Sequence, residues 1–182
     1  NKSMIIQPDQ IEAIVDHTQS GTRRRITVVK SSTGEFPPLG VRPDELRRLG
    51  AGAVVISGPR GENRCAVARA IHLATGASDM FFQPASTVDV DDFVSSLDDP
   101  EGKIRPSASD TVFVDEAQTL ASQTHDRLFS LADSIGCRVI VGVTRGDEAA
   151  AITSRTTNVV NVTPLVTRKE DIPVLVATIL SD

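Results

Sequence analysis

The chain has no tryptophan and no tyrosine, and aromatic residues make up 3% of its 182 residues. Proteins that bind single-stranded nucleic acid without sequence preference stack the bases on aromatic side chains, so such a platform is not expected here. The three histidines, His17, His72 and His125, are widely scattered, and no metal-ligand spacing appears. Two cysteines, Cys65 and Cys137, are too few for a disulfide scaffold, and we expect both to be reduced thiols.

Long apolar runs are also missing. No stretch is long enough to span a bilayer, and no signal-peptide pattern is present, so the sequence predicts a cytoplasmic protein without a membrane partner. The length and a hydrophobic content of 40% are enough for one well-packed domain with a small extension.

Charge is unevenly distributed along the chain, whose formal net charge is −5. Residues 1–75 hold 11 Lys/Arg and 7 Asp/Glu, whereas residues 76–182 hold 8 and 17. A basic half and an acidic half suit self-association, as a ring or a dimer, or an anionic ligand at the basic end. An uneven but solvated surface explains the pattern equally well. The basic run Arg23–Arg25 is likewise either a phosphate contact or, more commonly, a solvated turn.

The most informative stretch is Val54–Arg69, VVISGPRGENRCAVAR. An apolar strand, a Gly/Pro turn and a helical pattern follow one another, which is the order that places nucleotide phosphates in P-loop proteins. The P-loop motif is G-x-x-x-x-G-K-S/T, and Gly58 fits its first glycine. Gly61 lies within the loop.

The last three positions of that motif depart from it. Asn63 stands for the second glycine and tolerates a left-handed backbone, but lacks the freedom of glycine to approach a ligand closely. Arg64 stands for the lysine, and its wide, forked guanidinium replaces a compact charge. Cys65 stands for the hydroxyl residue, and a soft thiol is a poor ligand for hard Mg²⁺. Hydrolysis is therefore not expected, although ATP or ADP with Mg²⁺ could still bind weakly. Cys65 is either a thiol of low pKa near a helix N-terminus or, more commonly, a small buried residue.

A second motif, VFVDE, ends in Asp115 and Glu116. It matches the Walker B pattern, in which the aspartate holds Mg²⁺ and the glutamate polarises the attacking water. A strand ending in acidic residues is weak evidence alone, but its place after the glycine loop in an α/β chain makes the motif more specific.

Periodicity predicts strands and helices in alternation, and hence a parallel sheet covered by helices on both faces. The expected helices are Gln10–His17, Asp44–Leu49, Ala66–Leu73, Val88–Leu97, Ser122–Ile135 and Ile172–Leu180. The expected strands are Ile26–Val29, Ala53–Ser57, Thr111–Val114, Arg138–Val143 and Val159–Val162, with an apolar segment that begins at Phe81. Gly21–Arg25, 31–43 and Pro164–Asp171 are expected turns or loops, and Asp98–Asp110 is expected to be a polar loop.

Four blocks resemble the AAA+ domain of bacterial enhancer-binding proteins, the sigma-54-dependent (NtrC-like) transcription activators. GPRGENRCAVARAIH (Gly58–His72) is similar to the family's G-E-S-G-T-G-K-E-x-x-A-R-A-I-H. VFVDEAQTL (Val112–Leu120) is similar to L-F-L-D-E-x-x-x-L. RVIVGVTRGDE (Arg138–Glu148) is similar to R-V-I-A-A-T-N-R-D. PLVTRKEDIPVLV (Pro164–Val176), the most specific block, is similar to P-L-R-E-R-x-E-D-I-P-x-L-V, which opens the family's lid subdomain.

The resemblance implies a three-layer P-loop NTPase (AAA+) fold with a central, mainly parallel sheet and a truncated lid. It implies an extension of uncertain affiliation at 1–45, a core at 46–163 and the start of the lid at 164–182. Within the core, the resemblance places these residues around a nucleotide: Gly58, Gly61, Asn63, Arg64, Cys65, Asp115, which would also hold Mg²⁺, and Arg145. Glu116 would be a vestigial catalytic residue, and Arg155 is the candidate for an arginine acting on a neighbouring subunit.

Departures from the family weaken its activity in this chain. Arg145 stands where the family has an asparagine that senses the γ-phosphate, and Arg145 could instead form a salt bridge with Asp115 or Glu116. No G-A-F-T-G-A, the family's sigma-contacting motif, lies between Phe82 and Asp115.

The losses favour a degenerate domain that acts as a signal-transmission or oligomerisation scaffold in a transcription regulator. RNA polymerase or a sigma factor is a candidate partner, and DNA would be bound through another domain. One alternative is an active ATPase in which Arg64 does the work of the lysine. Another is a structural protein that forms a ring or filament without nucleotide.

Overall fold

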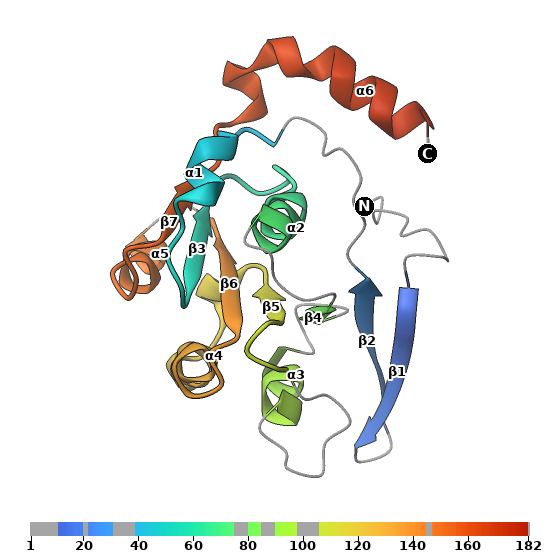
Figure 1. Cartoon of the computed structure of the whole chain (residues 1–182), viewed down its shortest axis with the longest axis vertical. Helices are drawn as coiled ribbons and strands as arrows, with labels where there is room; N and C mark the ends of the chain where they lie inside the picture. Colours follow the sequence, from blue (N-terminus) through green and yellow to red (C-terminus); the bar gives the residue numbers. More distant parts are fainter. Residues whose placement is uncertain are drawn as a thin grey trace.

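In the computed structural model, the described residues are 11–19, 22–30, 39–74, 80–84, 90–97, 106–144 and 147–181. Among them the strands form one seven-stranded sheet in the order β1-β2-β4-β5-β6-β3-β7 (Figure 1). The strands are β1 (Ile11–Gln19), β2 (Thr22–Lys30), β3 (Val54–Ser57), β4 (Met80–Pro84), β5 (Thr111–Val114), β6 (Arg138–Val143) and β7 (Val159–Asn161). From β4 to β7 all neighbours pair in parallel, whereas the β1–β2 hairpin joins β4 through antiparallel pairing.

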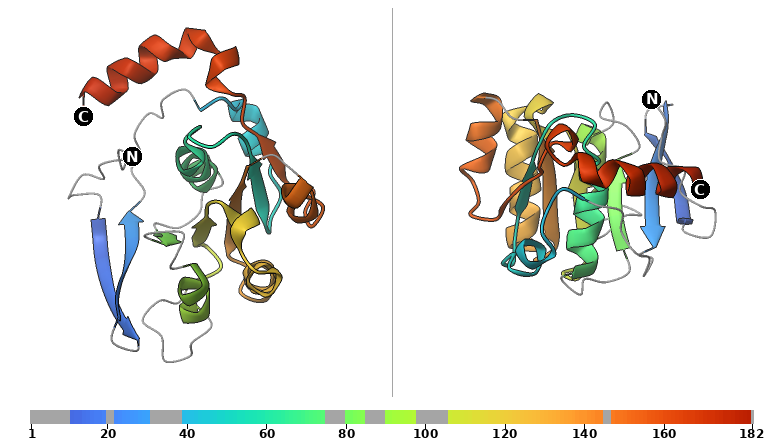
Figure 2. Two further views of the ribbon diagram at one scale, coloured as in Figure 1. Left: turned by 180° about the vertical axis from the view of Figure 1, so that it is seen from behind. Right: turned by 90° about the horizontal axis from the view of Figure 1, so that it is seen from above.

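Helices lie on both faces of the sheet (Figure 2). The α-helices are α1 (Pro43–Arg47), α2 (Arg64–Ala74), α3 (Val90–Leu97), α4 (Ser122–Ser134), α5 (Asp147–Thr153) and α6 (Ile172–Ser181). Three short 3-10 helices are η3 (Ala117–Thr119), η4 (Leu165–Thr167) and η5 (Lys169–Asp171). No helix in the described part of the chain is long and apolar enough to cross a membrane.

Alternation along the parallel strands creates two apolar cores. In β3, Val55 packs into the core that is shared with α3, α4 and α5, whereas Val54 and Ile56 pack into the core shared with α1 and α2. All four residues of β3 and all four of β5 are buried, as expected for strands with helices on both faces. The three-layer α/β fold with a central, mainly parallel sheet, which the sequence predicted, is therefore confirmed.

The expected helix at Gln10–His17 is wrong, because Ile11–Gln19 forms strand β1. The helical spacing of Ile11, Ile14 and Val15 was a short signal in a run that is also rich in β-branched residues. Antiparallel pairing with β2 over eight residue pairs gives this segment backbone hydrogen bonds and overrides the local pattern. For the same reason Arg23–Arg25 lie in β2, opposite Asp16–Thr18, and not in a turn.

The remaining elements lie close to the expected positions. Helix α5 was missed because the segment DEAAAIT offers one short turn pattern without a clear start signal. Residues 31–38 of the expected loop at 31–43 and most of the expected loop Asp98–Asp110 lie outside the described residues. The proposed boundaries near 45 and 164 stay predictions, and we note that β2 continues the core sheet through its pairing with β4.

Helix α4 offers a test of this packing. Leu128 is fully buried against the sheet, so Leu128→Ala is expected to reduce the free energy of unfolding by about 2–5 kcal/mol. Gln123→Ala, at an exposed site on the same helix, should change it by less than about 0.5 kcal/mol. Urea denaturation of both variants measures the difference, and equal effects would contradict the assigned faces of α4.

Candidate functional site

The name Gly58 loop is used below for residues 58–64, which are the loop that joins β3 to α2 together with Arg64, the first residue of that helix. This segment lies at the carboxyl end of the parallel strands. The amide of Gly58 donates to the carbonyl of Val143 at 3.1 Å, which ties the start of the loop to β6. Gly61 and Asn63 both have positive φ angles, 87° and 53°. Asn63 tolerates this conformation, and its Oδ1 accepts a 3.4 Å hydrogen bond from the amide of Ala66. Asparagine therefore provides both the turn and the cap of α2.

Arg64, at the first position of α2, is the centre of the site. Its side chain is buried, and its residue is 3% exposed. The guanidinium Nε donates to Asp115 Oδ1 at 2.8 Å, and Nη2 donates to Glu116 Oε1. Nη1 donates to the Gly58 carbonyl and to Thr144 Oγ1, both at 3.0 Å. All three guanidinium nitrogens are thus engaged, and two of them contact the acidic pair of the Walker B motif.

Glu116 faces Arg64 because its own backbone is left-handed, with φ of 54°. Non-glycine residues seldom adopt this conformation, which costs free energy that the surrounding contacts must offset. Oε2 accepts from Gln118 Nε2 at 2.6 Å and from Thr144 Oγ1 at 3.3 Å, and Arg60 Nε lies 3.5 Å from Oε1. Burial raises the pKa of Glu116, but the hydrogen bond from Gln118 and the charge of Arg64 outweigh it, so that the pKa is lowered overall.

Asp115 is half-exposed and lies directly over strand β6. Its Oδ1 accepts from Arg64 Nε and from the amide of Glu116, the latter at 2.9 Å. A methyl group built on Gly142 would overlap this carboxylate, so glycine is required at that position of β6. The missing side chain at Gly142 of β6 therefore leaves room for the carboxylate of Asp115 beside Arg64.

Cys65 is a half-buried free thiol. Its Sγ donates to Gln83 Oε1 at 3.2 Å, which links α2 to β4. Burial raises the pKa of Cys65, so the alternative of a low-pKa thiol is wrong. Cys137 is also a free thiol, as expected, and burial raises its pKa to about 11.

The structure brings six of the sequence-predicted residues together at the carboxyl ends of the strands: Gly58, Gly61, Asn63, Arg64, Asp115 and Glu116. Cys65 begins the same helix but points to β4. Arg145 lies outside the described residues, so its expected salt bridge with Asp115 or Glu116 stays a prediction. Arg64, on the Gly58-loop side, already pairs with both carboxylates.

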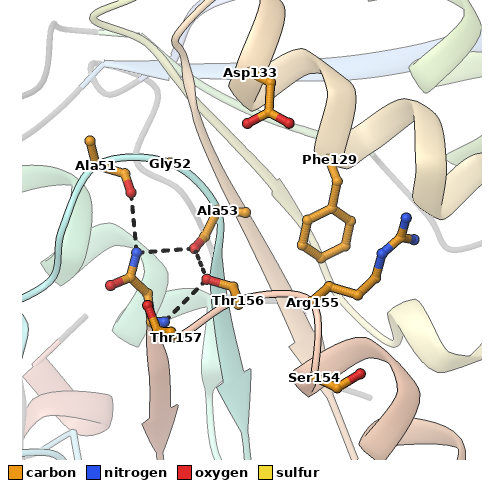
Figure 3. Close-up of a pocket in the computed structure, with 10 residues that line it drawn as sticks. Ala51, Gly52, Ala53, Phe129, Asp133, Ser154, Arg155, Thr156 and Thr157 are labelled. Atoms are coloured by element: carbon orange, nitrogen blue, oxygen red, sulfur yellow. Dashed lines mark hydrogen bonds between the residues drawn. The ribbon is translucent and has the colours of Figure 1, made fainter.

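Arg155 lies at the opposite end of the sheet. It lines an open pocket of about 570 Å³ beside Ala51–Ala53 and Thr156–Asn158, which precede β3 and β7 (Figure 3). Its guanidinium stacks over Phe129 at 4.8 Å and pairs with Asp126. Arg155 therefore cannot act on the Gly58 loop of its own chain, and a role on a neighbouring subunit stays a prediction.

Sequence reasoning missed three residues of the site: Gln118, Gly142 and Thr144. Each fixes or shields one of the acidic side chains, and none belongs to the Walker motifs. Thr144 gave the clearest signal, because it ends an apolar strand at the same sheet edge as Asp115. The role of Gly142 depends on an inter-strand approach that no local pattern encodes.

No family model and no curated protein matches this chain. Among solved structures, the chain is similar to a threonine-to-valine variant of RuvB from Thermotoga maritima, with a TM-score of 0.44 and 16% identity over 78% of this chain and 48% of that one. It is also similar to a lysine-to-arginine mutant of the same protein, with a TM-score of 0.42 and 14% identity over 69% and 48%. The chain thus spans about half the length of these proteins, and the likeness concerns the fold alone.

Replacing Arg64 tests how much the contacts of the site contribute to the free energy of unfolding. Arg64→Met keeps most of the side-chain volume but removes the buried cation from Asp115 and Glu116, so a loss of about 3–5 kcal/mol in the free energy of unfolding is expected. Arg60→Met is the matched control in the same loop, since the Arg60 side chain is 82% exposed. A similar, small loss in both variants would show that Arg64 has no special role in stability.

The lowered pKa of Glu116 predicts a pH dependence. Because the folded-state pKa lies below the unfolded value, the stabilisation is present above the unfolded pKa and disappears as the pH falls through the folded pKa. The difference in unfolding free energy between the wild type and Glu116→Gln should therefore be largest near pH 6–7 and shrink toward pH 3. Urea titrations along this pH range measure it, and a difference that grows on acidification would refute the assignment.

Proposed function

We propose that this chain is a degenerate AAA+ domain in which an arginine of the Gly58 loop occupies the place of a magnesium nucleotide. The single observation that carries the proposal is the position of Arg64. Its buried guanidinium joins the loop to both acidic residues of the Walker B motif. In the proposed domain, Arg64 makes the contact between the loop and the two acidic residues that a bound nucleotide would otherwise provide.

The residues present do not fit a magnesium nucleotide. Oε1 of Glu116 accepts from Arg64 and Oε2 from Gln118, so the carboxylate is not placed to take a proton from water. Oδ1 of Asp115 is neutralised by Arg64, and Cys65 offers a thiol that points toward Gln83. No group of three or more potential metal ligands occurs among the described residues.

The biological role that fits such a domain is that of a scaffold in a transcription regulator, which transmits a signal or supports self-association. This part of the proposal rests on the four sequence blocks that resemble enhancer-binding proteins. In that setting RNA polymerase or a sigma factor is the proposed partner, and DNA is bound by a different domain. The uneven charge of the two halves of the chain supports self-association.

The alternative, an active ATPase, requires a different position of the Arg64 side chain. For Arg64 to bind phosphate in place of a lysine, it would have to leave Asp115 and Glu116. That movement separates a buried guanidinium from two carboxylates, a step that costs several kcal/mol when a buried pair is broken. Phosphate binding would have to offset this cost.

A combined binding and turnover experiment separates the two functions. A fluorescent ATP analogue is titrated with Mg²⁺ while phosphate release is followed in the same sample. The wild type is expected to release no phosphate and to bind, if at all, with a dissociation constant of about 1 mM or weaker. Phosphate release by the wild type that Glu116→Gln abolishes would refute the scaffold proposal.

A variant in which the P-loop motif is restored provides the positive control. The triple substitution Asn63→Gly, Arg64→Lys and Cys65→Thr removes the guanidinium from the acidic pair and supplies the standard lysine and hydroxyl. Nucleotide affinity is expected to rise about tenfold or more over the wild type, because the loop amides and the lysine become accessible to phosphate. Arg60→Lys, at the exposed position of the same loop, is the control and should leave affinity unchanged.

A further inference from the structure

A second contact of the Gly58 loop points away from the acidic pair. Oε1 of Glu62 accepts a 2.9 Å hydrogen bond from the amide of Leu165, and Oε2 accepts from Arg168 Nη2 at 3.1 Å. Leu165 and Arg168 belong to the segment between β7 and α6, about a hundred residues away along the chain. Glu62 of the Gly58 loop is therefore hydrogen-bonded to the segment that directly precedes α6.

The Glu62–Arg168 contact is enclosed, unlike an ordinary surface ion pair. The two side chains are 14% and 9% exposed. Arg168 also donates from Nε to the Thr163 carbonyl and from Nη1 to Asp171 Oδ2, both at 2.9 Å. An arginine with several fixed partners keeps a single orientation, so the contact holds the loop and the segment in one defined relation.

Gly40 confirms how closely this corner is packed. A Cβ atom added there would lie 2.7 Å from Arg168 Nε and 2.8 Å from the Thr163 carbonyl. The Gly40 carbonyl itself accepts from the amide of Thr163 at 2.9 Å. The segments that contain Gly40, Glu62 and Arg168 thus meet at Arg168. This close approach limits position 40 to glycine.

The first turns of α6 leave apolar side chains uncovered. Ile172, Val174 and Val176 are 40%, 52% and 47% exposed, and the helix extends across the top of the molecule (Figure 1). Packing of these three residues therefore contributes less than the packing of a core helix does. The start of α6 depends correspondingly on the segment that precedes it.

We propose that Glu62 is a positioning residue that sets the orientation of α6 from the Gly58 loop without any bound ligand. The loop carries an anion, Glu62, and a cation, Arg64, two residues apart. Each pairs with an oppositely charged side chain of the same chain. Arg64 pairs with Asp115 and Glu116 on the side of the sheet, and Glu62 pairs with Arg168 on the side of α6. The loop thereby links the sheet to α6 as one unit. This inference goes beyond the proposed function, because it holds whether or not nucleotide is hydrolysed.

Amide hydrogen exchange at Leu165 tests the link directly, since that amide donates to Glu62. The full chain is compared with Glu62→Ala by residue-resolved NMR. Exchange at Leu165 is expected to accelerate about tenfold or more in Glu62→Ala, while the amides of β3 and β6 keep their protection. Glu62→Gln retains an oxygen acceptor without the charge, so it should give an intermediate acceleration.

A fluorescent reporter follows the helix itself. The chain has no tryptophan, so Val176→Trp introduces a single emitter on α6. In the Glu62→Ala background its anisotropy is expected to fall, because the helix gains freedom relative to the sheet. Asp44→Ala is the control, since it removes a carboxylate from the exposed Arg42–Asp44 pair and should change neither signal.

Unchanged exchange at Leu165 and unchanged anisotropy in Glu62→Ala would overturn the proposal. If Glu62→Ala does not fold, as judged by the β3 amides, the shorter Glu62→Asp is scored by the same two signals. Failure of the proposed function would appear elsewhere, as phosphate release by the wild type, and would leave these signals untouched.

Discussion

The guanidinium of Arg64 between Asp115 and Glu116 is the interaction on which the site depends. Charges taken out of water are costly, and an ion pair offsets that cost only when its geometry is good and its remaining donors and acceptors are satisfied. Arg64 meets this condition through Gly58 and Thr144, and Glu116 meets it through Gln118 and Thr144. The left-handed backbone of Glu116 and the glycine at position 142 are consequences of bringing these groups together.

The side chains of the Gly58 loop connect two parts of the chain. Arg64 is directed to Asp115 and Glu116 at the sheet, and Glu62 is directed to Arg168 before α6. In the proposed function these contacts take the place of a bound nucleotide, so that the loop and the start of α6 keep one arrangement without turnover.

Much of the fold followed from local patterns, because the strands VVIS, TVFV and RVIVGV are short, apolar and, apart from Arg138, buried. Part of β2 was expected as the strand Ile26–Val29, but β1 was not expected, because it depends on pairing with β2 and its apolar spacing suits a helix equally well. At the site, the motif positions of Arg64, Asp115 and Glu116 were visible in the sequence. Their mutual contact was not, and a salt bridge from Arg145 to one of the acids was only one alternative that the sequence left open. The contributions of Thr144, Gly142 and Glu62 arise from approaches between distant segments, which a single sequence does not encode.

The most direct measurement is of Arg64 itself. The Nε–H resonance of Arg64 and the backbone amides of the Gly58 loop can be followed by ¹H–¹⁵N NMR while MgATP is added to about 5 mM, a concentration at which even a millimolar ligand is mostly bound. The account predicts that the Arg64 Nε–H remains protected and unshifted, because the guanidinium stays on Asp115 and Glu116. A saturable shift of that resonance together with the loop amides would show that Arg64 turns to the phosphates, and would contradict the account.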